Sequence, residues 1–154
     1  EKDTLYLNII SNLLNSLSSR LLGKKLRDEN DLIYSSKVIS YDRFGVFEIT
    51  ALINKDNLDL VKMKILEVIN DLKNEKIVAP LLENIKERKR LNLLRMLDDK
   101  YSLLGDFIVE DLGYDDTNLE FYNKVKEVTA KDISNFIDRL ILDTIYFLKE
   151  EEHE

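Results

Sequence analysis

Residues 32–53 have the sequence LIYSSKVISYDRFGVFEITALI, and this segment determines the class of the fold. Its first part, residues 32–41, is rich in the β-branched and aromatic residues that favour strands. The tetrapeptide DRFG at 42–45 supplies a turn, and a second strand is expected over 46–53. Two strands joined by so short a turn predict an antiparallel hairpin. The period of two in the second strand directs four apolar side chains to one face: Phe47, Ile49, Ala51 and Ile53.

Apolar residues with a helical period lie on both sides of this hairpin. Before it, a broad stripe over residues 3–17 predicts a nearly buried helix, and a shorter helix should end near Asn30. After it, Asp56 is expected to cap a helix that runs to about Lys76, and Pro80 fits the first turn of the next helix. Further helices are expected at residues 100–112, 118–127 and 131–139.

The end of the chain returns to the composition of a strand, in Asp143-Thr144-Ile145-Tyr146-Phe147-Leu148. The order of elements therefore predicts an α+β fold, in which an antiparallel sheet made of the hairpin and this C-terminal strand is packed by several helices. Residues 1–154 are expected to form a single domain, because the chain is too short for two ordinary ones. Since Glu1 already stands in a helical pattern, we expect a fragment of a longer, multi-domain chain.

Composition limits the classes of function. The chain is 44% hydrophobic and 34% charged, which is typical of a globular protein and not of a disordered one. Its net charge of −7 argues against nonspecific binding to nucleic acid. No run of 18 apolar residues predicts a membrane span, and the N-terminus does not resemble a signal peptide. We therefore expect no membrane or nucleic-acid partner and a cytoplasmic location.

Most catalytic and metal-binding motifs are absent from the sequence. Without cysteine there is no thiolate zinc site and no cysteine nucleophile. The single histidine, His153, stands in the acidic tail at residues 150–154, so neither a Ser-His-Asp triad nor H-x-x-E-H can form. The basic run Lys86-Glu87-Arg88-Lys89-Arg90 could meet phosphate or an acidic partner, but with Glu83 and Glu87 nearby an ordinary charged helix face is the favoured explanation. We expect no catalytic residue, no metal and no cofactor in this domain.

Arg27 and Tyr34 form the most distinctive local pair. Arg27 stands at the end of the second helix and Tyr34 near the start of the first strand, seven residues later. A guanidinium and a phenol in one cleft could hold a peptide carbonyl or carboxylate by hydrogen bonds. Two plainer explanations remain open: Arg27 could serve only the dipole of its helix, and Tyr34 could simply pack.

The same residues belong to a longer pattern. Ser19-Arg20-Leu21, Leu26-Arg27 and Leu32-Ile33-Tyr34-Ser35 follow the order and spacing of S-R-L…L-R-E-x-x-x-L-A-Y-S, and Val128-Thr129-Ala130-Lys131-Asp132-Ile133 is similar to the helix start V-T-x-E-D-I. In these motifs the chain resembles the insulinase-type zinc metallopeptidases, the inverzincins. Its last segment, residues 142–148, resembles the final strand of the bacterial paralogues of that family that have lost the zinc motif.

The resemblance carries expectations about function. Members of the family close two halves around a peptide chamber; one half holds zinc, and the other usually supplies an Arg and a Tyr seven residues apart. It therefore implies a noncatalytic C-terminal domain in which Arg27 and Tyr34 bind substrate, with zinc only on a partner half. The expected partners are the other domains of its own chain or a paralogous peptidase subunit. The alternative is a pure assembly or regulatory module without a peptide site.

Overall fold

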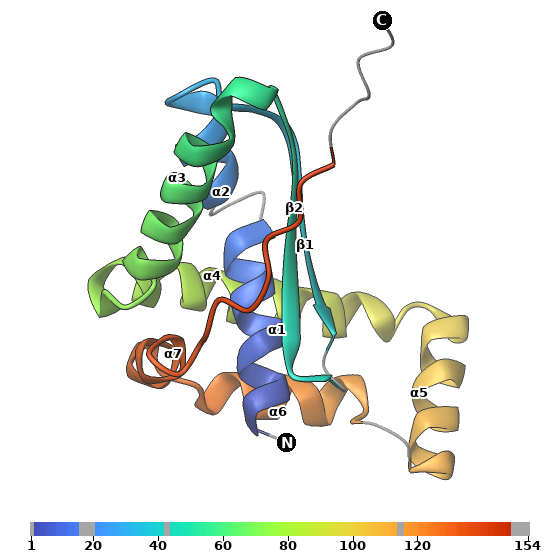
Figure 1. Ribbon diagram of the computed structural model, residues 1–154. Coiled ribbons are helices and arrows are strands. Elements are labelled where there is room, and N and C mark those ends of the chain that lie inside the picture. Colours follow the sequence, from blue (N-terminus) through green and yellow to red (C-terminus); the bar gives the residue numbers. More distant parts are fainter. Residues whose placement is uncertain (1, 16–20, 42–43, 114–115, 149–154) are drawn as a thin grey trace, which may run out of the picture.

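The hairpin stands upright at the centre of the computed structural model, with helices around it (Figure 1). The structure describes all residues except 1, 16–20, 42–43, 114–115 and 149–154, so the expectations for Ser19, Arg20 and His153 lie outside it. The elements are, in chain order, α1 (Lys2–Asn15), α2 (Leu21–Gly23), the π-helical turn η1 (Lys24–Asp28), β1 (Ile33–Tyr41), β2 (Val46–Ile53), the 3-10 turn η3 (Lys55–Asn57), α3 (Leu58–Asp71), α4 (Glu75–Met96), α5 (Lys100–Leu112), α6 (Asn118–Glu127) and α7 (Ala130–Ile137). The α+β class and the antiparallel hairpin are confirmed.

One face of the hairpin packs on α1, and the other is exposed. The four residues of β2 expected on one face are partly buried against the core, and the alternate residues of β2 are exposed. In β1, Val38 lies opposite Ile49 on the inner face. The period of two therefore predicted the inner face of β2 correctly.

The end of α1 covers part of the outer edge of β1. The backbone N–H of Val38 donates to Asn15 Oδ1 at 3.2 Å, and Asn15 Nδ2 donates to the carbonyl of Val38 at 2.7 Å. In an antiparallel pair, alternate residues of an edge strand direct both backbone groups away from the neighbouring strand. The amide of Asn15 thus takes the place of a further strand at Val38, and it protects an edge that would otherwise invite pairing with another chain.

The hydrophobic core joins residues that are far apart in the sequence. α1 contributes five buried apolar residues, and it contacts the hairpin, α2, α4, α6 and α7. α7 adds Ile133, Phe136 and Ile137 from the other end of the chain, with the Phe136 ring 5.3 Å from that of Tyr6. The broad stripe of the first helix therefore corresponds to a central, nearly buried helix, as predicted.

The boundary between α3 and α4 differs from the one predicted. Asp56 lies in η3 instead of capping the helix, α3 ends at Asp71, and α4 begins at Glu75, so that Pro80 stands inside α4. The side chain of Asn74 caps α4 by accepting from the backbone N–H of Lys76 at 3.0 Å. Pro80 has no backbone N–H and cannot donate the usual helical hydrogen bond. Helix α4 tolerates this loss because the cap at Asn74 and the buried residues of its first half stabilise the helix.

The C-terminal strand is a wrong prediction. Residues 141–148 form neither strand nor helix, and among the described residues the sheet consists of β1 and β2 alone. Ile145, Tyr146 and Leu148 are exposed, while Phe147 is half-buried. Residues of this type pack well in a sheet, but they form a strand only where a neighbouring strand is there to pair with.

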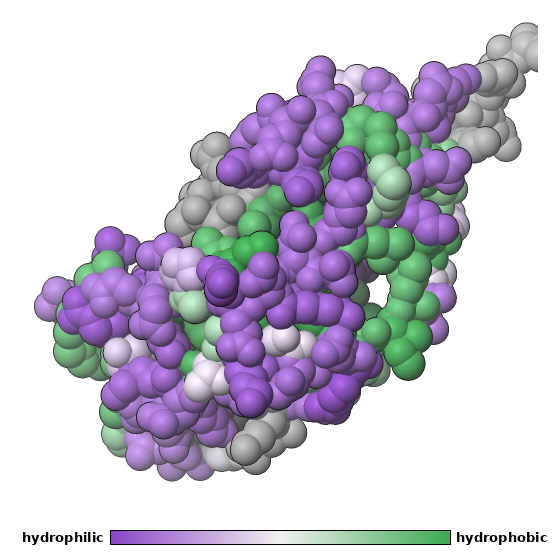
Figure 2. All heavy atoms as spheres, turned by 90° about the vertical axis from the view of Figure 1, so that its left-hand side faces the viewer, coloured by the Kyte–Doolittle hydropathy of each residue, from purple (hydrophilic) through white to green (hydrophobic). Residues whose placement is uncertain are grey.

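The helices are not arranged evenly around the hairpin. In Figure 1, α4 crosses behind α1, α6 lies beneath, and α5 stands apart on the right. The face that carries α3 and α7 is mainly hydrophilic, with a band of hydrophobic atoms through its middle (Figure 2). No helix in the described part of the chain has the length and apolar character needed to cross a membrane.

Candidate functional site

Tyr34 lies in a β-bulge at the open end of the hairpin. Ile33 is paired with Ile53, but Ser35 is paired with Leu52, so Tyr34 is the extra residue of β1. Ile33 is buried whereas Tyr34 and Ser35 are both exposed, which is the side-chain order that a bulge produces. The bulge turns the Tyr34 side chain outward, where it is 64% exposed.

Among the residues that the structure describes, one hydrogen bond holds the phenol of Tyr34. Its hydroxyl donates to Asn54 Oδ1 at 3.2 Å, and Asn54 directly follows β2. The hydroxyl oxygen retains lone pairs that can accept a hydrogen bond from a ligand. The bulge and Asn54 together therefore fix the phenol at the end of the hairpin away from its turn.

Arg27 lies in the π-helical turn η1, which contacts β1. The turn is closed by Asp31, whose φ of 50° lies in the left-handed region. The N–H of Asp31 donates to the carbonyl of Arg27 at 2.9 Å, and that of Leu32 donates to the carbonyl of Leu26 at 2.7 Å. Each bond spans one residue more than in a Schellman motif, because η1 is wider than an α-helix. The chain is thereby folded back, and Arg27 lies near the beginning of β1.

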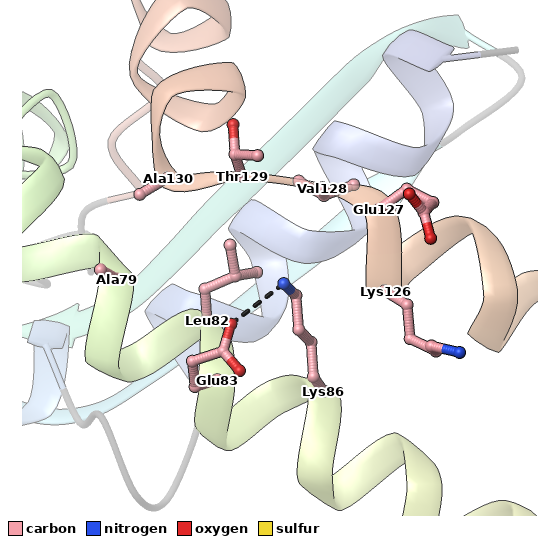
Figure 3. A pocket seen from close by; sticks show the side chains of 9 residues that line it. All are labelled: Ala79, Leu82, Glu83, Lys86, Lys126, Glu127, Val128, Thr129 and Ala130. Atoms are coloured by element: carbon pink, nitrogen blue, oxygen red, sulfur yellow. Dashed lines mark ion pairs between the residues drawn. The ribbon is translucent and has the colours of Figure 1, made fainter.

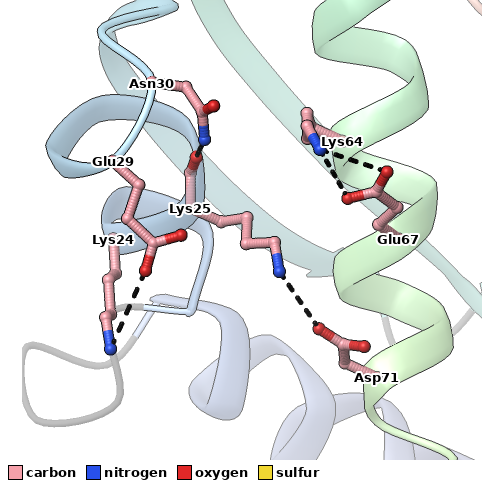
Figure 4. A network of polar contacts seen from close by, with 7 residues as sticks. All are labelled: Lys24, Lys25, Glu29, Asn30, Lys64, Glu67 and Asp71. Carbon is pink, nitrogen blue, oxygen red and sulfur yellow. Dashed lines mark hydrogen bonds and ion pairs between the residues drawn. The ribbon is translucent and has the colours of Figure 1, made fainter.

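Polar contacts attach η1 to its surroundings (Figure 4). Lys25 Nζ lies 3.8 Å from Asp71 Oδ2 at the end of α3, and Lys24 Nζ lies 3.8 Å from Glu29 Oε1. Asn30 Nδ2 donates to the carbonyl of Lys25 across the turn. Since exposed ion pairs contribute little to stability, the buried Leu26 is the main anchor of η1, and these contacts set its orientation.

Arg27 and Tyr34 are thus brought to the same end of the hairpin but not into contact. Arg27 Nε donates to Asp28 Oδ1 at 3.1 Å, and the Arg27 side chain is 49% exposed. Its terminal nitrogens make no hydrogen bond to any residue that the structure describes. The N–H groups of both terminal nitrogens can therefore donate to a carbonyl or carboxylate, and the phenol oxygen, whose proton is donated to Asn54, can accept from a peptide N–H.

A separate pocket of about 300 Å³ lies between α4 and the junction of α6 and α7 (Figure 3). Its apolar lining consists of Ala79, Leu82, Val128 and Ala130, and its charged lining of Glu83, Lys86, Lys126 and Glu127. Lys86 Nζ is paired with Glu83 Oε1 at 3.0 Å. Because the lining holds two acids and two bases, the pocket has no preference for the charge of a ligand.

The basic run at residues 86–90 is engaged within the protein. Arg90 Nη2 pairs with Glu87 Oε1 at 2.7 Å on the same helix, in addition to the pair made by Lys86. Lys89 Nζ lies 4.6 Å from the centre of the Phe121 ring, and burial together with the nearby Arg88 lowers the pKa of Lys89. These contacts are those of a charged helix face packed on α6.

Sequence reasoning missed both the bulge and the cover provided by Asn15. The sequence carried part of the signal for the bulge: Ile33 and Val38 are both apolar, but a strict period of two places them on opposite faces, whereas the structure buries both. Asn15 had no such signal, because its partner Val38 is distant in the sequence. In the described part of the chain, no three His, Cys, Asp or Glu side chains gather as metal ligands.

No protein-family model, curated protein or solved structure matches this chain.

Proposed function

We propose that this chain is a noncatalytic domain of the insulinase type that contributes Arg27 and Tyr34 to a peptide-binding wall. The observation that carries the proposal is the bulge, which turns Tyr34 outward at the end of the hairpin where η1 presents Arg27. The seven-residue spacing and the surrounding motifs agree with it.

In this role the domain orients a peptide and leaves the chemistry to another part of the assembly. The guanidinium donates to a carbonyl or terminal carboxylate of the peptide, and the phenol oxygen accepts a hydrogen bond from a peptide N–H. Hydrolysis requires zinc held by H-x-x-E-H on another domain of the same chain or on a paralogous subunit, where the metal activates water. The proposal places this assembly in the cytoplasm.

The test is a titration of the chain with a pool of labelled peptides that carry free C-terminal carboxylates. Saturable binding is expected, and Arg27→Ala should weaken it about tenfold or more, because charge-assisted hydrogen bonds are lost. Tyr34→Phe should have a smaller effect in the same direction. Arg95→Ala and Tyr41→Phe are matched controls, because Arg95 is exposed on α4 and Tyr41 is exposed at the turn end of β1, away from Tyr34. Binding that these four variants leave equal would remove the assignment.

The alternative function is a pure assembly or regulatory module with no peptide site. Helix α5 favours it, since this helix has no buried residue and exposes large apolar side chains. Exposed apolar surface of this kind marks interaction sites between proteins. Peptide binding that depends on Arg27 and Tyr34 separates the first proposal from this one.

A further inference from the structure

Helix α5 presents its apolar face to solvent. Positions three, four and seven apart share one side of a helix, and Tyr101, Leu104, Ile108 and Leu112 follow this spacing. With Phe107 beside them, they form a face whose members are between 49% and 85% exposed. We call these five residues the α5 face.

The opposite side of α5 is the one that meets the rest of the protein. Ser102, Asp106 and Val109 are half-buried there. Asp106 Oδ1 accepts hydrogen bonds from the backbone N–H of Asn118 at 2.9 Å and from Asn118 Nδ2 at 2.8 Å, which ties α5 to the start of α6. The polar side of the helix is therefore turned inward and the apolar side outward, the reverse of an ordinary surface helix.

Two charged residues flank the α5 face, and each stands at the end of the helix where the helix dipole disfavours its charge. Lys100 is the first residue of α5 and Asp111 stands in its last turn, whereas a helix is stabilised by acids at its start and bases at its end. Both are exposed, and neither has an ion-pair partner among the residues that the structure describes. Both share the side of Leu104 and Phe107, from which they are four or seven positions away.

We infer that the α5 face binds the same face of a second copy of this chain, with the two helices antiparallel. A twofold axis between residues 105 and 106 places Lys100 opposite Asp111 of the second copy, and Leu104 opposite Phe107. Each charge then lies beside the end of the neighbouring helix that favours it. A self-complementary patch is what a twofold interface requires, and charges at both ends fix the antiparallel direction.

The test is sedimentation velocity of the 154-residue chain over a range of concentrations. A monomer–dimer equilibrium is expected, and Leu104→Ser combined with Phe107→Ser should weaken the dimer by more than tenfold. Lys100→Glu or Asp111→Lys alone should weaken it about tenfold, because each change creates two like-charged pairs across the axis. The two changes together should restore it, since both pairs become attractive again. Lys62→Glu, an exposed reversal on α3, is the control.

Circular dichroism melting shows whether each variant folds, and Lys100→Glu should not destabilise α5, since an acid suits the start of a helix. A chain that stays monomeric throughout would overturn the inference. A dimer whose stability the single charge reversals leave unchanged would also overturn it and would point to the hairpin edges. The same holds if combining Lys100→Glu with Asp111→Lys fails to restore the dimer. Binding of α5 to a different protein while the chain itself remains monomeric would also overturn it.

Discussion

Helices α1 and α5 have similar length and apolar content but opposite surroundings. α1 spans 14 residues and buries five apolar side chains against the hairpin and four helices, whereas α5 spans 13 residues and buries none. The difference does not come from hydrophobicity. It arises because segments distant in the sequence pack around α1, while α5 is held mainly at its polar side. The comparison teaches that an apolar helix marks the core or an interface, and that its neighbours decide which.

The comparison predicts unequal costs for the same substitution in the two helices. Leu13→Ala should lower the free energy of unfolding by about 2–5 kcal/mol, because Leu13 is fully buried and a cavity would remain. Leu104→Ala should change it by less than about 0.5 kcal/mol at concentrations where the chain is monomeric, because Leu104 is exposed. Urea unfolding measures both. Equal costs would mean that α5 belongs to the core.

The hairpin edge offers a second, smaller test of how the core is closed. Asn15→Ala should cost about 1–3 kcal/mol, because both backbone groups of Val38 lose their partner. Asn12→Ala is the matched control: within the described part of the chain its side chain bonds only to Asn8 of α1, and alanine is the better helix former. A loss of stability in Asn12→Ala as large as that in Asn15→Ala would show that the edge contact contributes nothing.

The smallest expected effect is on how stability depends on pH. It comes from the ion pair between Asp3 of α1 and Arg139, which follows α7. Arg139 Nη2 lies 2.7 Å from Asp3 Oδ2, and its hydrogen bonds hold the pKa of Asp3 below its ordinary value. A carboxyl whose pKa is lowered in the folded state stabilises the fold above its unfolded pKa, and this stabilisation is lost as the pH falls through the folded pKa.

Asp3→Asn should therefore make stability fall less steeply below about pH 4. Unfolding measured at several pH values checks this, with Arg139→Ala as the second variant expected to have the same effect. An unchanged slope in both variants would contradict the role of the pair.

The parts of the fold that rest on local patterns could be predicted from the sequence. The hairpin, the inner face of β2 and the helices at 100–112 and 118–127 follow from periodicity and turn residues. The end of α3 and the position of Pro80 in α4 could not be predicted, since the cap at Asn74 competes with the usual preference of proline for a first turn. The prediction of a C-terminal strand was wrong for another reason: a segment with the composition of a strand does not form one without an edge to pair with.

The candidate site could be predicted only in part. The residue types and spacing of Arg27 and Tyr34 were visible in the sequence, but the π-helical turn and the bulge that orient them arise from packing of η1 on β1. That these residues bind a peptide stays a prediction.

The most direct test of this account is hydrogen–deuterium exchange of the chain with and without the peptide pool. The account predicts slower exchange of the amides from Arg27 to Tyr34 when peptide is bound, with no change in α5 at a concentration where the chain is monomeric. Slower exchange confined to α5, or no change in the segment from Arg27 to Tyr34 at saturating peptide, would contradict it.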